Sequence, residues 1–197
     1  DHLNRDSMDR AMRMIAGPGR LEIYAVGHYG AVASDAQFKF LRVGVSAVAY
    51  TDPRLQTLSA NLLRPDDVVL VISSSGRIAE LLTVAETAQA RGAKVIAITE
   101  SQSPLARRAD LALIVDHVED SATQVPMISR ILHLLMVDIL VVGVTLHRGA
   151  SVPALGSDAT MGLDEVAPGG HPAQIARRKG PGVSAAGPLA HLTSHSR

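Results

Sequence analysis

Short apolar runs alternate with longer amphipathic segments between residues 20 and 146. The apolar runs have the length and residue types of strands, and the segments between them have helical periodicity. Strands followed by helices in this rhythm predict a parallel sheet with right-handed crossovers, in a three-layer α/β/α sandwich. The predicted strands are Leu21–Val26, Val45–Tyr50, Val68–Ile72, Lys94–Thr99 and Leu111–Val115. The predicted helices cover 30–41, 53–63, 78–90, a short stretch from Ser103, and most of 121–146.

Local signals support several of these boundaries. Val68–Ile72 is a continuous run of aliphatic, mostly β-branched residues, which is typical of a central strand covered on both faces. Asp52 followed by Pro53 has the pattern of an N-cap with proline at the first helical position. The Ser103–Pro104 pair predicts a further helix start.

The two ends of the chain differ in character from the middle. Residues 2–16 predict an N-terminal helix that ends at Gly17-Pro18-Gly19. After Arg148, Gly, Pro, Ser and Ala dominate and the apolar period is lost, which predicts a disordered tail. We therefore divide the chain into an N-terminal helix (1–19), a main domain (20–148) and a Gly/Pro/Ser-rich tail (149–197).

The most apolar stretch, 131–146, is short for a membrane span and contains His133 and Asp138. It is interpreted as a buried helix or as the helix through which two copies of the chain associate. No membrane partner is predicted.

Composition narrows the function classes. Of 197 residues, 47% are hydrophobic, which is enough for one substantial core. Lys and Arg together number 19, as do Asp and Glu, so the basic excess of a lone nucleic-acid-binding domain is missing. There is no Cys, which argues against a disulfide framework or a thiolate metal site and agrees with a cytoplasmic location.

Two predicted turns carry candidate chemistry, because ligands of open α/β sheets bind beyond the carboxyl ends of the strands. The first is Gly27–Gly30 and the second is Ser73–Arg77. The second places three hydroxyls and a glycine before a helix N-terminus, where backbone N–H groups favour an anion. An ordinary turn with a helix cap is the alternative for these residues.

The segment Val68–Leu81, with Ser73-Ser74-Ser75-Gly76 at its centre, resembles the phosphosugar motif of sugar isomerase (SIS) domains. Gly30–Gln37 and Lys39-Phe40 are similar to the first helix of RpiR-family transcriptional regulators, in particular their HexR-like branch. The resemblance covers about residues 20–148. It implies a five-stranded parallel sheet with flavodoxin-like strand order.

The resemblance also implies site residues. Ser73 and Ser75 match phosphate-binding hydroxyls, Ser74 and Gly76 supply turn backbone, and Gly27 matches a glycine of the first loop. This chain has Tyr29 where the family usually has Ser, and Ile78 where it often has Thr. The expected phosphosugar site is Ser73, Ser74, Ser75, Gly76, Gly27, Tyr29 and Glu119, the last as a carboxylate near the sugar.

Catalysis is not expected from the sequence. Aldose–ketose isomerisation needs a general base, and SIS isomerases resembling arabinose-5-phosphate isomerase carry a Glu-Ala-x-His-Gly-type segment after the second strand. Residues 49–56 contain neither Glu nor His. His28 is interpreted as a surface or packing residue and His133 as a core or interface residue. No metal-ligand spacing or dinucleotide fingerprint is present, so no metal and no cofactor is expected.

Three hypotheses remain from the sequence. The first is a phosphosugar-binding effector domain of a transcriptional regulator of carbohydrate catabolism, a homodimer that meets DNA only through a separate helix-turn-helix domain. The second is a sugar-phosphate isomerase with an unusual base, and the third a dimerisation module whose pocket has decayed. The HexR-like resemblance implies a phosphorylated sugar or sugar acid from hexose catabolism, such as 2-keto-3-deoxy-6-phosphogluconate.

Overall fold

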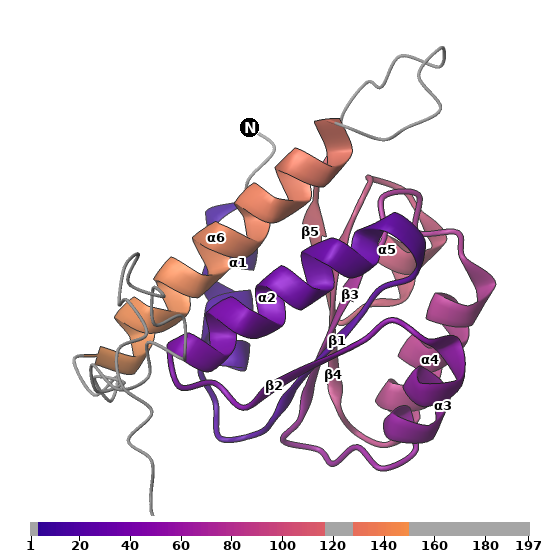
Figure 1. Ribbon diagram of the computed structural model, residues 1–197, viewed down its shortest axis with the longest axis horizontal. Helices are drawn as coiled ribbons and strands as arrows, with labels where there is room; N and C mark the ends of the chain where they lie inside the picture. Colours follow the sequence, from indigo (N-terminus) through magenta and orange to yellow (C-terminus); the bar gives the residue numbers. More distant parts are fainter. Residues whose placement is uncertain (1–3, 117–127, 150–197) are drawn as a thin grey trace, which may run out of the picture. The chain divides into compact units, whose positions relative to one another are not determined.

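The computed structural model describes residues 4–116 and 128–149. Strands and helices alternate along these residues as the apolar pattern predicts (Figure 1). The elements are α1 (Arg5–Ile15), β1 (Leu21–Tyr24), the 3-10 turn η1 (Gly27–Tyr29), α2 (Gly30–Arg42), β2 (Ala47–Tyr50), α3 (Pro53–Ala60), β3 (Val68–Ile72), α4 (Ala79–Ala90), β4 (Lys94–Thr99), α5 (Pro104–Arg108), β5 (Leu111–Ile114) and α6 (Ile128–Arg148).

The five strands form one parallel sheet in the order β2-β1-β3-β4-β5. This confirms the predicted flavodoxin-like order. β1 pairs with both β2 and β3, so the chain leaves β1 toward one side of the sheet and later returns to its other side. The change of direction places a topological switch point between β1 and β3, at their carboxyl ends.

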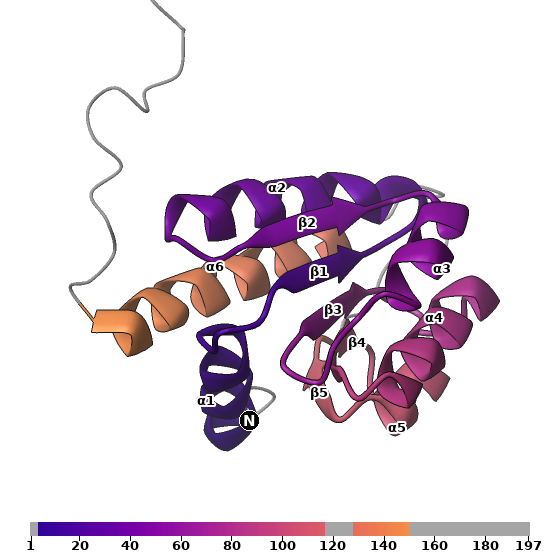
Figure 2. The same cartoon turned by 90° about the horizontal axis from the view of Figure 1, so that it is seen from below.

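Helices cover both faces of the sheet (Figures 1 and 2). One hydrophobic cluster joins α1, α2 and α6 to one face, and a second joins α3, α4 and α5 to the other. β3 contributes to both, because Leu70 and Ile72 lie in the first cluster and Val69 and Val71 in the second. All five residues of β3 are buried, which confirms its predicted central position.

Helix starts agree with the local signals, and some ends do not. Asp52 accepts hydrogen bonds from the backbone N–H of the two residues after Pro53, and Ser103 caps α5. α3 ends at Ala60, before the predicted end near Leu63. The Leu62 N–H donates to the Ser59 carbonyl at 2.8 Å, an i to i−3 bond that tightens the last turn and closes the helix.

α1 and α6 pack together on the sheet. Met8, Ala11 and Ile15 of α1 are buried in the cluster that also holds Leu140 and Val144 of α6. α6 is long and apolar enough to cross a membrane by length and composition alone, yet these residues pack against protein. The prediction of a packed apolar helix therefore holds for its described residues. The tail from 150 onward lies outside the described residues.

A buried polar cluster joins β1 to α3, and the apolar pattern gave no sign of it. The Glu22 carboxylate is fully buried and accepts hydrogen bonds from the Tyr24 hydroxyl and, at 2.7 Å, from the Ser59 hydroxyl. The Arg20 guanidinium lies 2.8 Å from the same carboxylate. Burial, followed by the hydrogen bond to Glu22, raises the pKa of Tyr24 far above its ordinary value. The tyrosine therefore stays a neutral donor to the carboxylate.

Glu22→Ala is expected to lower the free energy of unfolding by about 3 kcal/mol, because the buried hydroxyl and guanidinium groups lose the carboxylate that they contact. Urea denaturation measures the change. Glu86→Ala is the matched control, since this carboxylate is 57% exposed and pairs with Arg108 at the surface. The control is expected to change stability by about 0.5 kcal/mol or less. Equal effects of the two substitutions would contradict a structural role for the buried cluster.

Candidate phosphosugar site at the carboxyl edge of the sheet

The two sequence-predicted loops lie at the same edge of the sheet. The loop with Gly27 follows β1 and the turn Ser73–Gly76 follows β3. β1 and β3 are hydrogen-bonded parallel neighbours, with Tyr24 opposite Val71. Both loops therefore leave the sheet at the switch point, which is where ligands of this class of sheet bind.

The turn after β3 is held by its own hydroxyls. Ser73 is buried, and its Oγ accepts a hydrogen bond from the Gly76 N–H at 3.2 Å. Ser75 is exposed, and its Oγ accepts a long hydrogen bond from the Arg77 N–H at 3.4 Å. Since each oxygen acts here as an acceptor, each hydroxyl proton can still be donated to an anion.

The helix that follows presents an N-terminus without a side-chain cap. Ile78 is the N-cap residue of the 12-residue helix α4 and forms no side-chain cap. The first N–H groups of a helix lack intrahelical acceptors, and the helix dipole favours negative charge there. Arg77 adds an exposed cation, which lies 3.5 Å from Glu100. Hydroxyls, backbone N–H groups and an exposed guanidinium are the groups from which phosphate sites at helix N-termini are built.

Two buried hydroxyls beneath the turn were not predicted as site residues. Gly76 has a positive φ of 56°, and a Cβ added there would lie 2.5 Å from both Thr99 Oγ1 and Ser103 Oγ. Thr99 ends β4 and Ser103 caps α5, so both come from the neighbouring strand–helix connection. A sequence signal was available, because β4 is also expected to end at this edge of the sheet.

Tyr29 is placed differently from the other expected residues. Its side chain is buried, and its hydroxyl donates to Ser129 Oγ of α6 at 2.8 Å. Its ring centroid lies 4.2 Å from that of the exposed His28 and 4.9 Å from that of His133. The hydroxyl that was expected to meet a ligand thus joins the first loop to the start of α6.

Of the other residues singled out from the sequence, the structure describes Gly27 and His133 and does not describe Glu119. Gly27 is exposed with a φ of +61° and has open space around the position of a Cβ. His133 is fully buried, in agreement with its interpretation as a core residue, and its Nδ1 lies 2.6 Å from the Ser129 carbonyl oxygen. Glu119 falls in 117–127, outside the described residues. No group of three His, Asp or Glu side chains suited to a metal occurs in 4–116 and 128–149.

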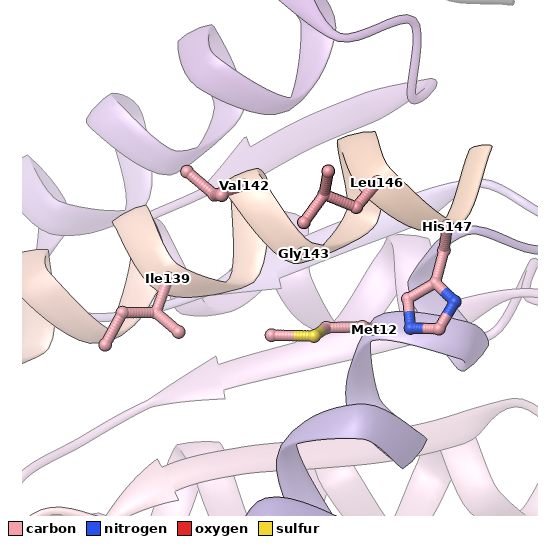
Figure 3. Close-up of a pocket in the computed structure, with 6 residues that line it drawn as sticks. All are labelled: Met12, Ile139, Val142, Gly143, Leu146 and His147. Carbon is pink, nitrogen blue, oxygen red and sulfur yellow. The ribbon is translucent and has the colours of Figure 1, made fainter. Parts of the chain in front are cut away.

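Two cavities lie along α6. The larger has a volume of about 490 Å³ and lies where α1 meets the C-terminal part of α6 (Figure 3). The smaller, about 150 Å³, lies between β5 and α6. The larger is lined by Met12, Ile139, Val142, Gly143, Leu146 and His147. Mostly apolar walls of this kind do not suit a phosphate group.

Comparisons with known proteins agree with the fold. The sequence profile of the SIS domain family matches residues 14–143. The bifunctional protein glk of Paraburkholderia xenovorans is 46% identical over 168 residues, which are 84% of this chain and 26% of that protein. The HTH-type transcriptional regulator HexR of Escherichia coli K12 is 38% identical over 148 residues, 75% of this chain and 51% of that protein. The chain thus spans about a quarter of the first relative and half of the second.

A solved structure, the Vibrio vulnificus NanR protein complexed with ManNAc-6P, is also similar. It has a TM-score of 0.69 and 25% sequence identity, and the match covers 74% of this chain and 56% of that chain.

Gly76→Ala is expected to destabilise the fold more than Gly27→Ala, although both glycines have positive φ. Left-handed backbone costs each variant about 1–2 kcal/mol. Only Gly76→Ala adds the collision with Thr99 and Ser103, for which overpacking typically costs about 1–3 kcal/mol more. Urea unfolding of the two variants measures the difference. Equal losses would mean that the turn does not press against the two hydroxyls.

Proposed function

Because the chain belongs to the SIS domain family, we propose that it is the phosphosugar-binding effector domain of a transcriptional regulator of carbohydrate catabolism. The observation that carries the proposal is the turn Ser73–Gly76, which offers hydroxyls and backbone N–H groups beside the uncapped start of α4. These are neutral donors that surround phosphate oxygens. Ser73, Ser74, Ser75 and Gly76 form the proposed phosphate site, with Gly27 across the switch point.

The relatives support a ligand class. The NanR protein of known structure is complexed with a sugar phosphate, and HexR is an HTH-type transcriptional regulator. We propose a phosphorylated sugar or sugar acid as the effector of this domain, with 2-keto-3-deoxy-6-phosphogluconate as the first compound to test. The domain would meet DNA through a separate helix-turn-helix domain and act in the cytoplasm, where the DNA is.

The proposed mechanism is a population shift. A ligand changes an equilibrium between two arrangements only if it binds one of them more tightly. Phosphosugar at the switch point would favour one arrangement of two associated copies, and the affinity of the linked DNA-binding domain would change with it.

The proposed association surface is the outer side of α6. Ile128, Leu135 and Val142 recur every seven residues and are 50–61% exposed. A seven-residue repeat of apolar side chains is the pattern by which two helices pack along a seam. Asp138 interrupts the line and forms an ion pair with Lys39 of α2. The hydrogen bonds to Asp138 and Asp35 raise the pKa of Lys39, so the pair stays charged beside the apolar residues.

The double variant Ser73→Ala with Ser75→Ala is expected to lose phosphosugar binding. In the unmodified chain, ligand at about a hundred times its Kd stabilises the fold by about 2.7 kcal/mol. This corresponds to a rise in Tm of about 5–10 °C, which the double variant should lack. Thermal unfolding with a panel of phosphosugars gives the measurement, and product analysis of the same samples detects turnover.

Thr83→Ala on α4 is the control, because its hydroxyl bonds to the Ala79 carbonyl within the helix. It should keep the full Tm rise. An undiminished rise in the double variant would remove the site assignment. Turnover of a phosphosugar would favour the isomerase hypothesis, and no rise with any compound would favour the dimerisation module.

Leu135→Glu is expected to convert the dimer to a monomer, because it places a charge in the proposed seam. Multi-angle light scattering measures the mass. Leu58→Glu is the matched control, since Leu58 lies on α3 and is 66% exposed. Dissociation by Leu58→Glu with an unaffected Leu135→Glu would assign the interface to α3, and a monomeric parent chain would contradict the association proposal.

A further inference from the structure

The connection from β4 to α5 touches the underside of the serine turn at several points. Thr99 Oγ1 donates to the Ser74 carbonyl at 3.1 Å, and the Glu100 N–H donates to the same oxygen at 2.9 Å. The Leu105 N–H donates to the Gly76 carbonyl at 3.1 Å. We infer that Thr99 and Ser103 are positioning residues for the phosphate group: they orient the turn that binds it without touching it. The inference rests on the proposed function.

The direction of each hydrogen bond in this group follows from the donors present. Thr99 has one hydroxyl proton, and a carbonyl oxygen only accepts, so that proton goes to Ser74. In the Thr99–Ser103 pair, 3.1 Å apart, Ser103 must therefore be the donor. The Ser103 oxygen itself accepts from the Ala106 N–H at 3.0 Å. A one-way chain of hydrogen bonds thus runs from the start of α5 to the carbonyl of Ser74.

Fixing a carbonyl also fixes the N–H of the next residue. In a planar trans peptide the C=O and the following N–H point in opposite directions. The Ser74 carbonyl points at Thr99 and Glu100, so the Ser75 N–H points away from them. The Gly76 carbonyl points at α5, so the Arg77 N–H also points away, on the side where Ser75 Oγ accepts from it at 3.4 Å. Two N–H groups are therefore aimed at the side of the turn opposite the β4–α5 connection, a geometry that binds anions.

Burial together with the position beneath Gly76 separates this role from direct ligand contact. Thr99 and Ser103 are fully buried, whereas Ser75 is exposed. Gly76 leaves no space between the turn and the two hydroxyls. The pair acts on a ligand only through the orientation of the peptides above it. Without the Thr99 hydroxyl, the Ser74 carbonyl loses one of its two donors, and the peptide becomes freer to turn.

Thr99→Val is expected to weaken binding of 2-keto-3-deoxy-6-phosphogluconate, measured by calorimetry, about tenfold, the effect of losing one buried hydrogen bond. Valine keeps the shape of threonine and removes the hydroxyl. Thr99→Ser is the matched control, because it keeps the hydroxyl and removes the methyl group. It is expected to bind within about twofold of the parent chain.

Inorganic phosphate supplies a second measurement. In a two-dimensional NMR titration of the parent chain, the amide protons of Ser75 and Arg77 should shift downfield as phosphate binds. In Thr99→Val those shifts should shrink, and in Thr99→Ser they should persist.

The outcomes distinguish the positioning role of Thr99 and Ser103 from the proposed phosphosugar-binding function. Unchanged binding by Thr99→Val, or equal weakening in both Thr99 variants, would overturn the positioning role and leave the proposed function standing. Binding by the parent chain without shifts at Ser75 and Arg77 would do the same. A parent chain that binds neither probe while keeping its fold would overturn the proposed function first, and the inference with it.

Discussion

The proposed binding edge of the sheet depends on the burial of β3 on both of its faces. Side chains that alternate into two apolar clusters leave no room for a polar group along the strand. The first polar side chain after Val68–Ile72 is Ser73, which still lies in the buried layer. The turn must therefore satisfy its own polar groups, and it does so by bonding the Ser73 oxygen to the Gly76 N–H. The same requirement that ends the strand creates the compact turn that we propose as the phosphate site.

The same constraint explains why the layer beneath the turn is made of hydroxyls. Carbonyls that face the interior need donors, and a cation there would be costly to bury. Thr99 and Ser103 supply neutral donors in a fixed sequence, each satisfying the next group. A ligand-binding loop built in this way has its peptide orientations set before a ligand arrives. Preorganised donors lose little further freedom on binding, which favours affinity.

Local features of this fold could be predicted from the sequence, whereas contacts between distant residues could not. The strand Val68–Ile72 and the N-caps Asp52 and Ser103 depend on neighbours in sequence, and they were predicted correctly. The bond from Tyr29 to Ser129 crosses 100 residues, and periodicity carries no information about such a partner. The buried Glu22 was missed for the same reason, because its partner Ser59 lies on another element. The contact between Thr99 and the serine turn could have been predicted from the sequence, because the carboxyl ends of parallel strands lie at a common edge.

Under the proposed function, a ligand at the carboxyl edge of the sheet changes how two copies associate. α6 is the element that would couple these two events. Its buried side packs on the sheet, and its outer side carries the exposed apolar repeat. Its first turn accepts the hydroxyl of Tyr29, which comes from the loop after β1. The resemblance to RpiR-family regulators implies a serine at this position, whose shorter side chain would not extend as far. The first loop of this chain is thus tied to α6 by a buried hydrogen bond and by ring contact with His133.

A ligand that moves this loop would act on α6 through a buried contact. Interiors packed in this way shift between discrete arrangements more readily than they deform. Under the proposed function, the main role of Tyr29 is therefore not to fill the pocket. It connects the ligand edge of the sheet to α6, the helix on which two copies would meet.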